Sequence, residues 1–136
     1  MTVIDASALV AYCLNETGLD RARLKEHLAE GLTSIELIRA ESANAIVVAT
    51  RRGIVDEKTA RSALKAMLEL SKNNIEMVPL DVELVSEAFD RATSGDLAIY
   101  DLLYILVAKH QDAGLLTRDD RQMSAAKKLG IRTEKA

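Results

Sequence analysis

Four acidic residues stand at positions where an isolated negative charge is unfavourable. Asp5 follows two β-branched residues in VID, and Asp119 comes two residues after the segment LLT, so each lies at the end of a predicted strand or just past it. Glu41 and Asp101 lie among apolar neighbours in LIRAESANAIVV and AIYDLLYILVA, and no Lys or Arg lies three or four residues from Asp101. A buried ionised carboxylate must be paired, protonated or bound to a cation. Because Mg²⁺ and Mn²⁺ prefer oxygen ligands, we predict that these four carboxylates hold one or two such ions.

Each of the four acids also has a purely structural explanation. Asp5 and Asp119 could cap the helices that follow them, and Glu41 could be an exposed helical glutamate that pairs with neighbouring charges. Capping explains each aspartate singly. It explains neither Asp101 nor the occurrence of the whole set.

These acids must be positioned by a set of short β-rich segments separated by helical periodicity. In such an alternation the strands form a parallel sheet whose two faces are covered by helices. We therefore predict an α/β fold, a three-layer α/β/α sandwich with a central parallel sheet of four or five strands, in a single domain over residues 1–136. Functional sites of such sheets form outside the carboxyl ends of the strands, where Asp5 and Asp119 fall. The predicted strands are 2–5, 32–35, 75–80 and 115–118, with a weaker candidate at 131–134.

Helical periodicity fills the intervals between these strands. Asp56 and Asp81 are plausible N-caps, and glycines follow several of the helices. The predicted helices span 8–14, 19–30, 36–52, 56–74, 82–92, 97–113 and 120–129.

Composition limits the possible partners. The net charge of −3 argues against sequence-independent binding of nucleic acid by bulk charge, so such a partner would be held by a local basic patch or by bound cations. The single cysteine, Cys13, can form no internal disulfide, and no Cys/His cluster for zinc is present. We find neither a signal peptide nor an apolar stretch long enough for a membrane span, and therefore expect a cytoplasmic protein without a membrane partner.

Four segments in order give the chain a resemblance to a known family. These are VIDASALVAYCLNE, ELIRAESANAI, YDLLYILVAKHQDAGLLTRDDR and AAKKLGI. Together they resemble the PIN-domain family, and most of all the VapC-type ribonuclease toxins of prokaryotic toxin–antitoxin pairs. Each motif alone is weak, but their order and spacing along essentially the whole chain are fairly specific.

The resemblance implies a metal-dependent endoribonuclease with Mg²⁺ or Mn²⁺ as cofactor. Its acidic set would be Asp5, Glu41, Asp101 and Asp119. We hypothesise that metal-activated water attacks an RNA phosphodiester in line, leaving a 5′-phosphate and a 3′-hydroxyl. The resemblance further implies a homodimer and a cognate antitoxin whose C-terminal segment covers the acidic cleft. The helices at 36–50 and 55–70 offer surfaces for both.

Several neighbouring residues are candidates for supporting roles. Ser7 and Thr117 match the family's supporting polar positions, although their hydroxyls could instead satisfy backbone groups. Asn44, one turn after Glu41, could orient that carboxylate or contact phosphate, or it could be a buried structural amide. Asp96 and Asp120 are near enough in the chain to compete as metal ligands.

The roles of the histidines, tyrosines and basic residues are less well defined by the sequence pattern. His27 and His110 are predicted to be surface residues, and Tyr100 and Tyr104 are predicted to pack in the core or at an interface. Four cations flank the acidic motifs and could either hold the RNA backbone or be ordinary surface charges: Arg39, Lys109, Arg118 and Arg121.

Three other function classes also merit comparison. A signalling receiver domain places aspartates at strand ends and binds Mg²⁺, but it requires adjacent acids after the first strand, where VIDAS has one. A haloacid-dehalogenase-type phosphatase requires a second aspartate where Ser7 stands. A PIN-like scaffold that only binds partners would not need the complete acidic set.

Overall fold

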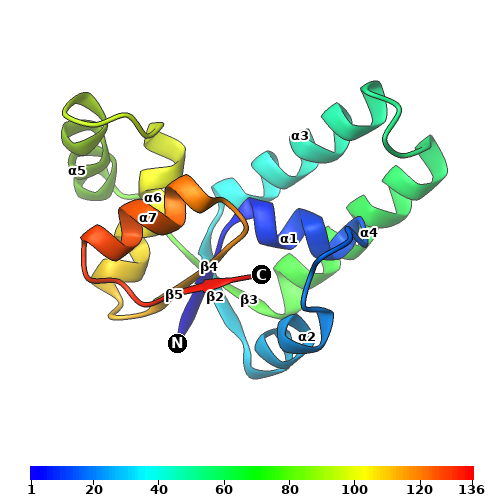
Figure 1. Cartoon of the computed structure of the whole chain (residues 1–136), viewed down its shortest axis with the longest axis horizontal. Coiled ribbons are helices and arrows are strands. Elements are labelled where there is room, and N and C mark those ends of the chain that lie inside the picture. Colours follow the sequence, from blue (N-terminus) through cyan, green and yellow to red (C-terminus); the bar gives the residue numbers. More distant parts are fainter.

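A parallel sheet of five strands holds the fold together in the computed structural model, which describes all residues from 1 to 136 (Figure 1). The strands lie in the order β3-β2-β1-β4-β5, with Val3 of β1 opposite Thr33 on one side and Leu115 on the other. The weaker candidate strand at 131–134 is present as β5, slightly later in the chain. The bounds are β1 Thr2–Ile4, β2 Leu32–Ile35, β3 Ile75–Val78, β4 Gly114–Thr117 and β5 Thr133–Lys135.

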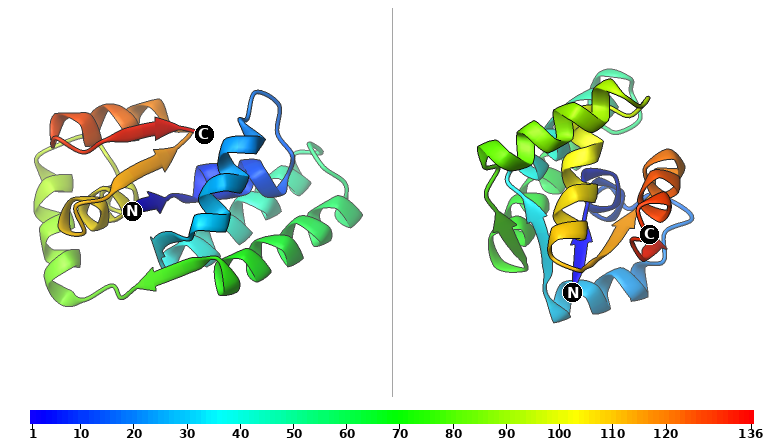
Figure 2. Two further views of the ribbon diagram at one scale, coloured as in Figure 1. Left: turned by 90° about the horizontal axis from the view of Figure 1, so that it is seen from below. Right: turned by 90° about the vertical axis from the view of Figure 1, so that its left-hand side faces the viewer.

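Helices cover both faces of this sheet and confirm the predicted three-layer α/β/α architecture. Figure 1 shows α5, α6 and α7 to one side of the strands and α1 to α4 to the other. The helices α3 and α4 pack as a long hairpin that projects beyond the sheet, as Figure 1 and the left view of Figure 2 show. The bounds are α1 Ala6–Cys13, α2 Arg21–Glu30, α3 Leu37–Arg51, α4 Glu57–Asn73, α5 Val82–Thr93, α6 Ile99–His110 and α7 Asp120–Lys128.

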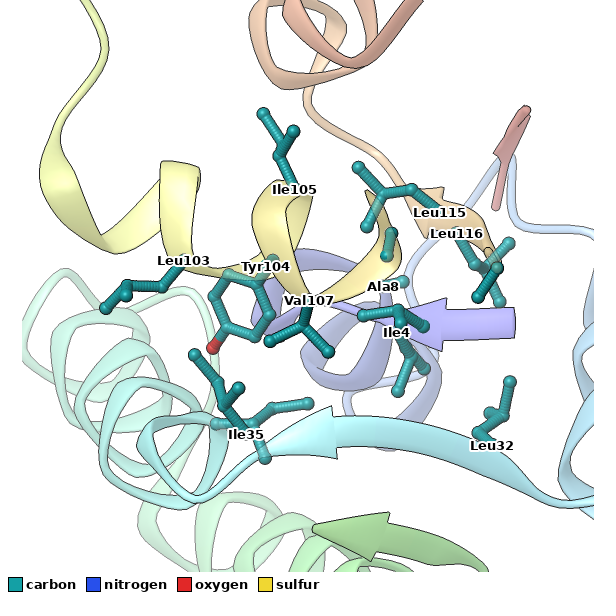
Figure 3. Packing of buried hydrophobic residues seen from close by; sticks show 14 of the residues in the cluster. Ile4, Ala8, Leu32, Ile35, Leu103, Tyr104, Ile105, Val107, Leu115 and Leu116 are labelled. Atoms are coloured by element: carbon teal, nitrogen blue, oxygen red, sulfur yellow. The ribbon is translucent and has the colours of Figure 1, made fainter. Parts of the chain in front are cut away.

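The centre of the core is the contact between α6 and the middle strands. Every residue of α6 from Leu102 to Ala108 is buried, because this helix packs on β1, β2 and β4 with α5 behind it. A helix that is apolar on all sides is stable only in such surroundings. Figure 3 shows buried side chains of the strands gathered around this helix, with Tyr104 reaching from α6 toward Ile35.

Aspartates begin most of the helices. Asp56 and Asp81 cap α4 and α5 as predicted, each accepting a backbone N–H three residues later. Asp5 and Asp119 also cap helices, α1 and α7 respectively. The capping explanation is therefore correct for both of these acids, and it does not exclude a further role.

The strand order reverses between β1 and β4. From β1 the chain continues to β2 and β3 on one side, whereas β4 is followed by β5 on the other side. In open parallel sheets this reversal leaves a crevice beyond the carboxyl ends of the two strands, because their connections diverge to opposite faces. Asp5 directly follows β1, and Asp119 lies two residues beyond the end of β4.

One residue predicted to lie on the surface is buried in the structure. His27 was predicted to be exposed but is buried, because its Nε2 lies 2.9 Å from Glu134 Oε2 and thereby joins α2 to β5.

No helix combines the length and the apolar character that crossing a bilayer requires.

Candidate active site

Asp5 is an almost fully buried carboxylate, with 3% of its surface exposed. Its Oδ1 accepts hydrogen bonds from Ala8 N–H at 3.0 Å and Ser7 Oγ–H at 2.7 Å, and its Oδ2 accepts one from Thr117 Oγ1–H at 2.6 Å. Burial raises the pKa of Asp5 to about 6, against the lowering effect of these hydrogen bonds, and the negative charge of Asp119 raises it further. The carboxylate is therefore held by neutral donors alone.

Thr117 connects Asp5 with the other end of the site. Its Oγ1 accepts the Asp119 N–H at 3.0 Å and lies 3.1 Å from Gln122 Oε1. A hydroxyl has one proton, so Thr117 donates either to Asp5 or to Gln122. The shorter distance and the charge of the acceptor favour Asp5.

Gln122 is a buried residue of α7 that the sequence analysis did not identify. Its Nε2 donates to the carbonyl oxygen of Asp101 at 3.0 Å, which fixes the amide with Oε1 toward Thr117. Gln122 thus ties the first turn of α6 to the end of β4. The available signal was its position four residues before Ala126, on the buried face of α7.

Asp101 lies in the first turn of α6 and Asp119 is the N-cap of α7, and their charges interact. Partial burial raises the pKa of Asp101, and the negative charges of Asp119 and Glu41 raise it further, while Arg121 lowers it. Asp119 accepts the N–H groups of Arg121 and Gln122 with one oxygen, Oδ1. The structure therefore places Asp101 within electrostatic reach of two other predicted acids, and Asp119 within reach of Asp5.

Glu41 is bound by Tyr104. The Tyr104 hydroxyl donates to Glu41 Oε1 at 2.7 Å, and its ring is buried with its hydroxyl directed away from α6 (Figure 3). Burial raises the pKa of Tyr104, and the nearby carboxylates of Glu41, Asp5 and Asp101 raise it further, so the phenol remains a donor. Tyr104 belongs to the core, as predicted, and it also orients an acid of the site.

None of the nine ion pairs in the structure involves Asp5, Glu41, Asp101 or Asp119. No three acidic, histidine or cysteine side chains are close enough together to enclose a metal ion by themselves. Mg²⁺ commonly keeps several waters and uses only one or two protein carboxylates, with substrate phosphate completing its shell. This unneutralised set of oxygen donors fits such a partly hydrated ion.

Other predicted residues have partners elsewhere or none. Asn44 is exposed and its side chain makes no hydrogen bond, so the alternative of a buried structural amide is wrong. The guanidinium of Arg39 donates to Oγ and the carbonyl oxygen of Ser71, in α4. Lys109 lies at the opposite end of α6, about 12 Å along the helix axis from Asp101.

The cations that follow β4 lie closer to the site. Arg118 donates to the carbonyl oxygens of Ala136 and Thr17. Arg121 is mostly exposed, and its positive charge lowers the pKa of Asp101. Among the four predicted RNA-binding cations, Arg121 is the one with a direct electrostatic link to the carboxylates.

The two acids that could compete as ligands differ in their surroundings. Asp120 Oδ1 is bound by Lys135 Nζ at 2.8 Å, which lowers the pKa of this carboxyl. Asp96 is almost fully exposed, and its Oδ2 lies 3.7 Å from Arg121 Nη2. Both acids therefore have cationic partners, unlike the four acids described above.

Comparison with known proteins places this arrangement in a family. Residues 2–128 match the sequence model of the PIN domain. Ribonuclease VapC3 of Pyrobaculum aerophilum is 30% identical over 122 residues, which cover 90% of this chain and 91% of that protein.

Solved structures agree with this match. PAE2754 from Pyrobaculum aerophilum superposes with a TM-score of 0.69 at 25% identity, covering 97% of this chain and 87% of that one. VapC20 of Mycobacterium tuberculosis, described as a Sarcin-Ricin loop cleaving toxin, shares the fold with a TM-score of 0.64 at 16% identity, covering 92% of this chain and 95% of that one. The chain belongs to the PIN-domain family.

Proposed function

We propose that this protein is a metal-dependent endoribonuclease and the toxin of a VapBC-type toxin–antitoxin pair. The observation that carries the proposal is the set Asp5, Glu41, Asp101 and Asp119. These acids come from four separate segments, influence one another electrostatically, and have no salt-bridge partner. Carboxylates in such a position are stabilised by a divalent cation.

The nature of the relatives supports RNA as the substrate. VapC3, which matches nine tenths of the chain, is a ribonuclease. A bound Mg²⁺ or Mn²⁺ would supply an activated water for attack on phosphorus and would offset the charge that develops on the phosphate oxygens. Because the nucleophile is water and not the ribose 2′-hydroxyl, no 2′,3′-cyclic phosphate is expected. The resemblance to the family implies that the 3′-oxygen leaves, so that the products carry a 5′-phosphate and a 3′-hydroxyl.

The residues of the chain position this chemistry. Ser7 and Thr117 hold the Asp5 carboxylate in one orientation, and Tyr104 does the same for Glu41. Gln122 fixes the first turn of α6 and with it the backbone of Asp101. Such supporting hydrogen bonds keep ligand oxygens in place before the ion and the substrate arrive.

An antitoxin partner is proposed by analogy with structural neighbours. VapBC2 from Rickettsia felis, solved bound to a DNA fragment from its promoter, shares the fold with a TM-score of 0.65 at 13% identity, covering 99% of this chain and 98% of that one. Homodimer formation remains a prediction. On α3 and α4, Val47 and Leu68 are exposed, and α5 presents Val82, Val85 and Phe89 on its surface.

The test is cleavage of single-stranded RNA by wild type and by Asp101→Asn, with Mg²⁺, with Mn²⁺ and with a chelator. We expect the substitution to lower the rate by more than about 100-fold, since even residues that only support a metal ligand are worth about 10–100-fold. Asp112→Asn is the matched control. Asp112 is exposed, lies beyond the other end of α6, and has a φ of 50° that asparagine adopts readily.

The Asp112→Asn control distinguishes the loss of an active-site carboxylate from a general effect of replacing aspartate by asparagine. If cleavage continues in the chelator, or is equally fast in Asp101→Asn and Asp112→Asn, the protein is not the proposed metal nuclease. A stable, folded wild type that cleaves no RNA under any of these conditions would favour the non-catalytic scaffold.

A further inference from the structure

A cavity of about 510 Å³ lies between α7 and the segment that joins α5 to α6. Figure 1 shows these elements together on one side of the sheet. One wall is a single stripe of α7 at helical spacing, made of Arg121, Ser124, Ala125 and Lys128. The opposite wall includes Arg91, near the end of α5, and the turn that follows it.

The turn opposite α7 is shaped by a glycine. A Cβ added to Gly95 would lie 3.2 Å from the carbonyl oxygen of Arg91, closer than such atoms normally approach. Glycine therefore allows the turn to fold back onto α5. This keeps the Arg91 side of the cavity close to the α7 side.

The cavity is basic in a chain whose net charge is −3. Three cations line it, Arg91, Arg121 and Lys128, against two acids, Asp96 and Asp120. Asp120 is already paired with Lys135, which lies outside the lining, and Asp96 is paired with Arg121 within it. Lys128 forms no ion pair and Arg91 reaches only Glu87, at 3.6 Å, so both retain capacity for an anionic ligand.

This basic cavity adjoins the acidic site. Two lining residues, Asp120 and Arg121, directly follow Asp119 in the chain. Leu102, the residue after Asp101, is also part of the lining. A polyanion with one phosphate at the carboxylates would therefore reach the cavity with a phosphate a short distance along the strand.

The lining also indicates which part of RNA fits. No Phe, Tyr or His lines the cavity, so it offers no surface on which a base could stack. Guanidinium, ammonium and the free hydroxyl of Ser124 are ligands for phosphate oxygens. Contacts of this kind position a strand without reading its sequence.

We propose that this cavity is a subsite for a backbone phosphate of the RNA flanking the scissile phosphodiester, with Arg91 and Lys128 as its cationic ligands. The inference rests on the proposed ribonuclease function and extends it to a strand-positioning surface. It assigns a role to two cations that do not flank the acidic motifs in the sequence.

The test measures RNA binding separately from cleavage. Binding of a short fluorescein-labelled single-stranded RNA is followed by anisotropy in the presence of a chelator, for wild type, Lys128→Gln and Arg91→Gln. Loss of one phosphate contact should reduce the slope of log K against log salt by about 0.7, which corresponds to about fivefold weaker binding at 0.1 M salt. The reduction should be the same for RNAs of different sequence, because phosphate contacts do not read bases.

Lys127→Gln is the matched control, since Lys127 is exposed on α7 next to Lys128 but does not line the cavity. It should leave both the affinity and the salt slope unchanged. The subsite is refuted if Lys128→Gln and Arg91→Gln bind like wild type, or if Lys127→Gln weakens binding equally.

The two proposals can fail separately. Wild-type cleavage with unchanged RNA binding by the cavity variants would leave the nuclease intact and remove the subsite. Weakened RNA binding by these variants in a protein that cleaves nothing would retain the subsite and remove the nuclease.

Discussion

The Asp5→Asn variant tests whether the carboxylate at the end of β1 destabilises the metal-free protein. Burial raises the pKa of Asp5 from its ordinary value of 3.8 to about 6. At about 1.4 kcal/mol per pH unit, this difference corresponds to about 3 kcal/mol of folding free energy lost when the carboxyl ionises inside the protein. Asparagine avoids this loss because it is neutral at every pH of interest.

The geometry allows asparagine to replace aspartate without a new unsatisfied group. Asparagine is as good an N-cap as aspartate, and its Oδ1 can accept the Ala8 N–H. Its Nδ2 would face Thr117 Oγ1, which can accept this bond while turning its own proton to Gln122 Oε1, 3.1 Å away. The variant should therefore keep the local structure.

The dependence on pH has a defined sign. Because the folded-state pKa lies above the unfolded one, the folded wild type binds more protons than the unfolded chain between pH 3.8 and about 6. Its stability relative to Asp5→Asn is therefore highest below pH 3.8 and falls as the pH rises through about 6. Above that range the full difference of about 3 kcal/mol should be present.

The assay is urea unfolding at pH 4 and pH 8 in a chelator. We expect similar stability at pH 4 and a variant more stable by about 3 kcal/mol at pH 8. Adding Mg²⁺ at pH 8 should stabilise wild type more than the variant, since the ion binds the carboxylate. A difference that does not change with pH, or a variant less stable than wild type at pH 8, would refute the electrostatic reasoning.

Two further substitutions test the supporting hydrogen bonds. Tyr104→Phe removes the donor to Glu41, so it should lower the free energy of unfolding in urea by about 1 kcal/mol and slow RNA cleavage. A variant that cleaves RNA as fast as wild type would show that Tyr104 does not orient the acid. Thr117→Val removes the donor to Asp5 and leaves the half-buried Asp119 N–H without its acceptor, so it should cost at least about 2 kcal/mol in urea unfolding. It should also raise the pKa of Asp5 above its value of about 6, as followed by NMR titration. Thr117→Ser keeps the hydroxyl and should show neither effect.

The sequence was sufficient to predict the elements and their layers, because strands and helices alternate with clear periodicity and most helices begin at an aspartate. It also placed Asp5 and Asp119 at strand ends, which in a parallel sheet share one edge. The order β3-β2-β1-β4-β5 was not predictable from these patterns, since all five strands are short and their sequences do not specify which strands pair. Family membership removes the receiver-domain and phosphatase alternatives.

Side-chain partners between distant segments were not predictable. A polar residue on the apolar face of a helix is either buried with a partner or shifted to the surface, and periodicity alone does not distinguish the two. Gln122 and His27 are buried with partners, whereas Asn44 is exposed. The partners of charged side chains were equally unpredictable. Arg39 is close to Glu41 in sequence, but its guanidinium donates to Ser71.

Asp5 and Asp119 hold the first turns of α1 and α7 as well as contributing negative charge to the site. An alanine at either position would remove a helix cap along with the charge, whereas an asparagine would remove the charge and keep the cap. Descendants of this chain that have lost catalysis but are still selected to fold should therefore carry asparagine there, a change that needs only one altered nucleotide in the codon. Residue type at these two positions would then distinguish inactivated copies from active ones in genomes.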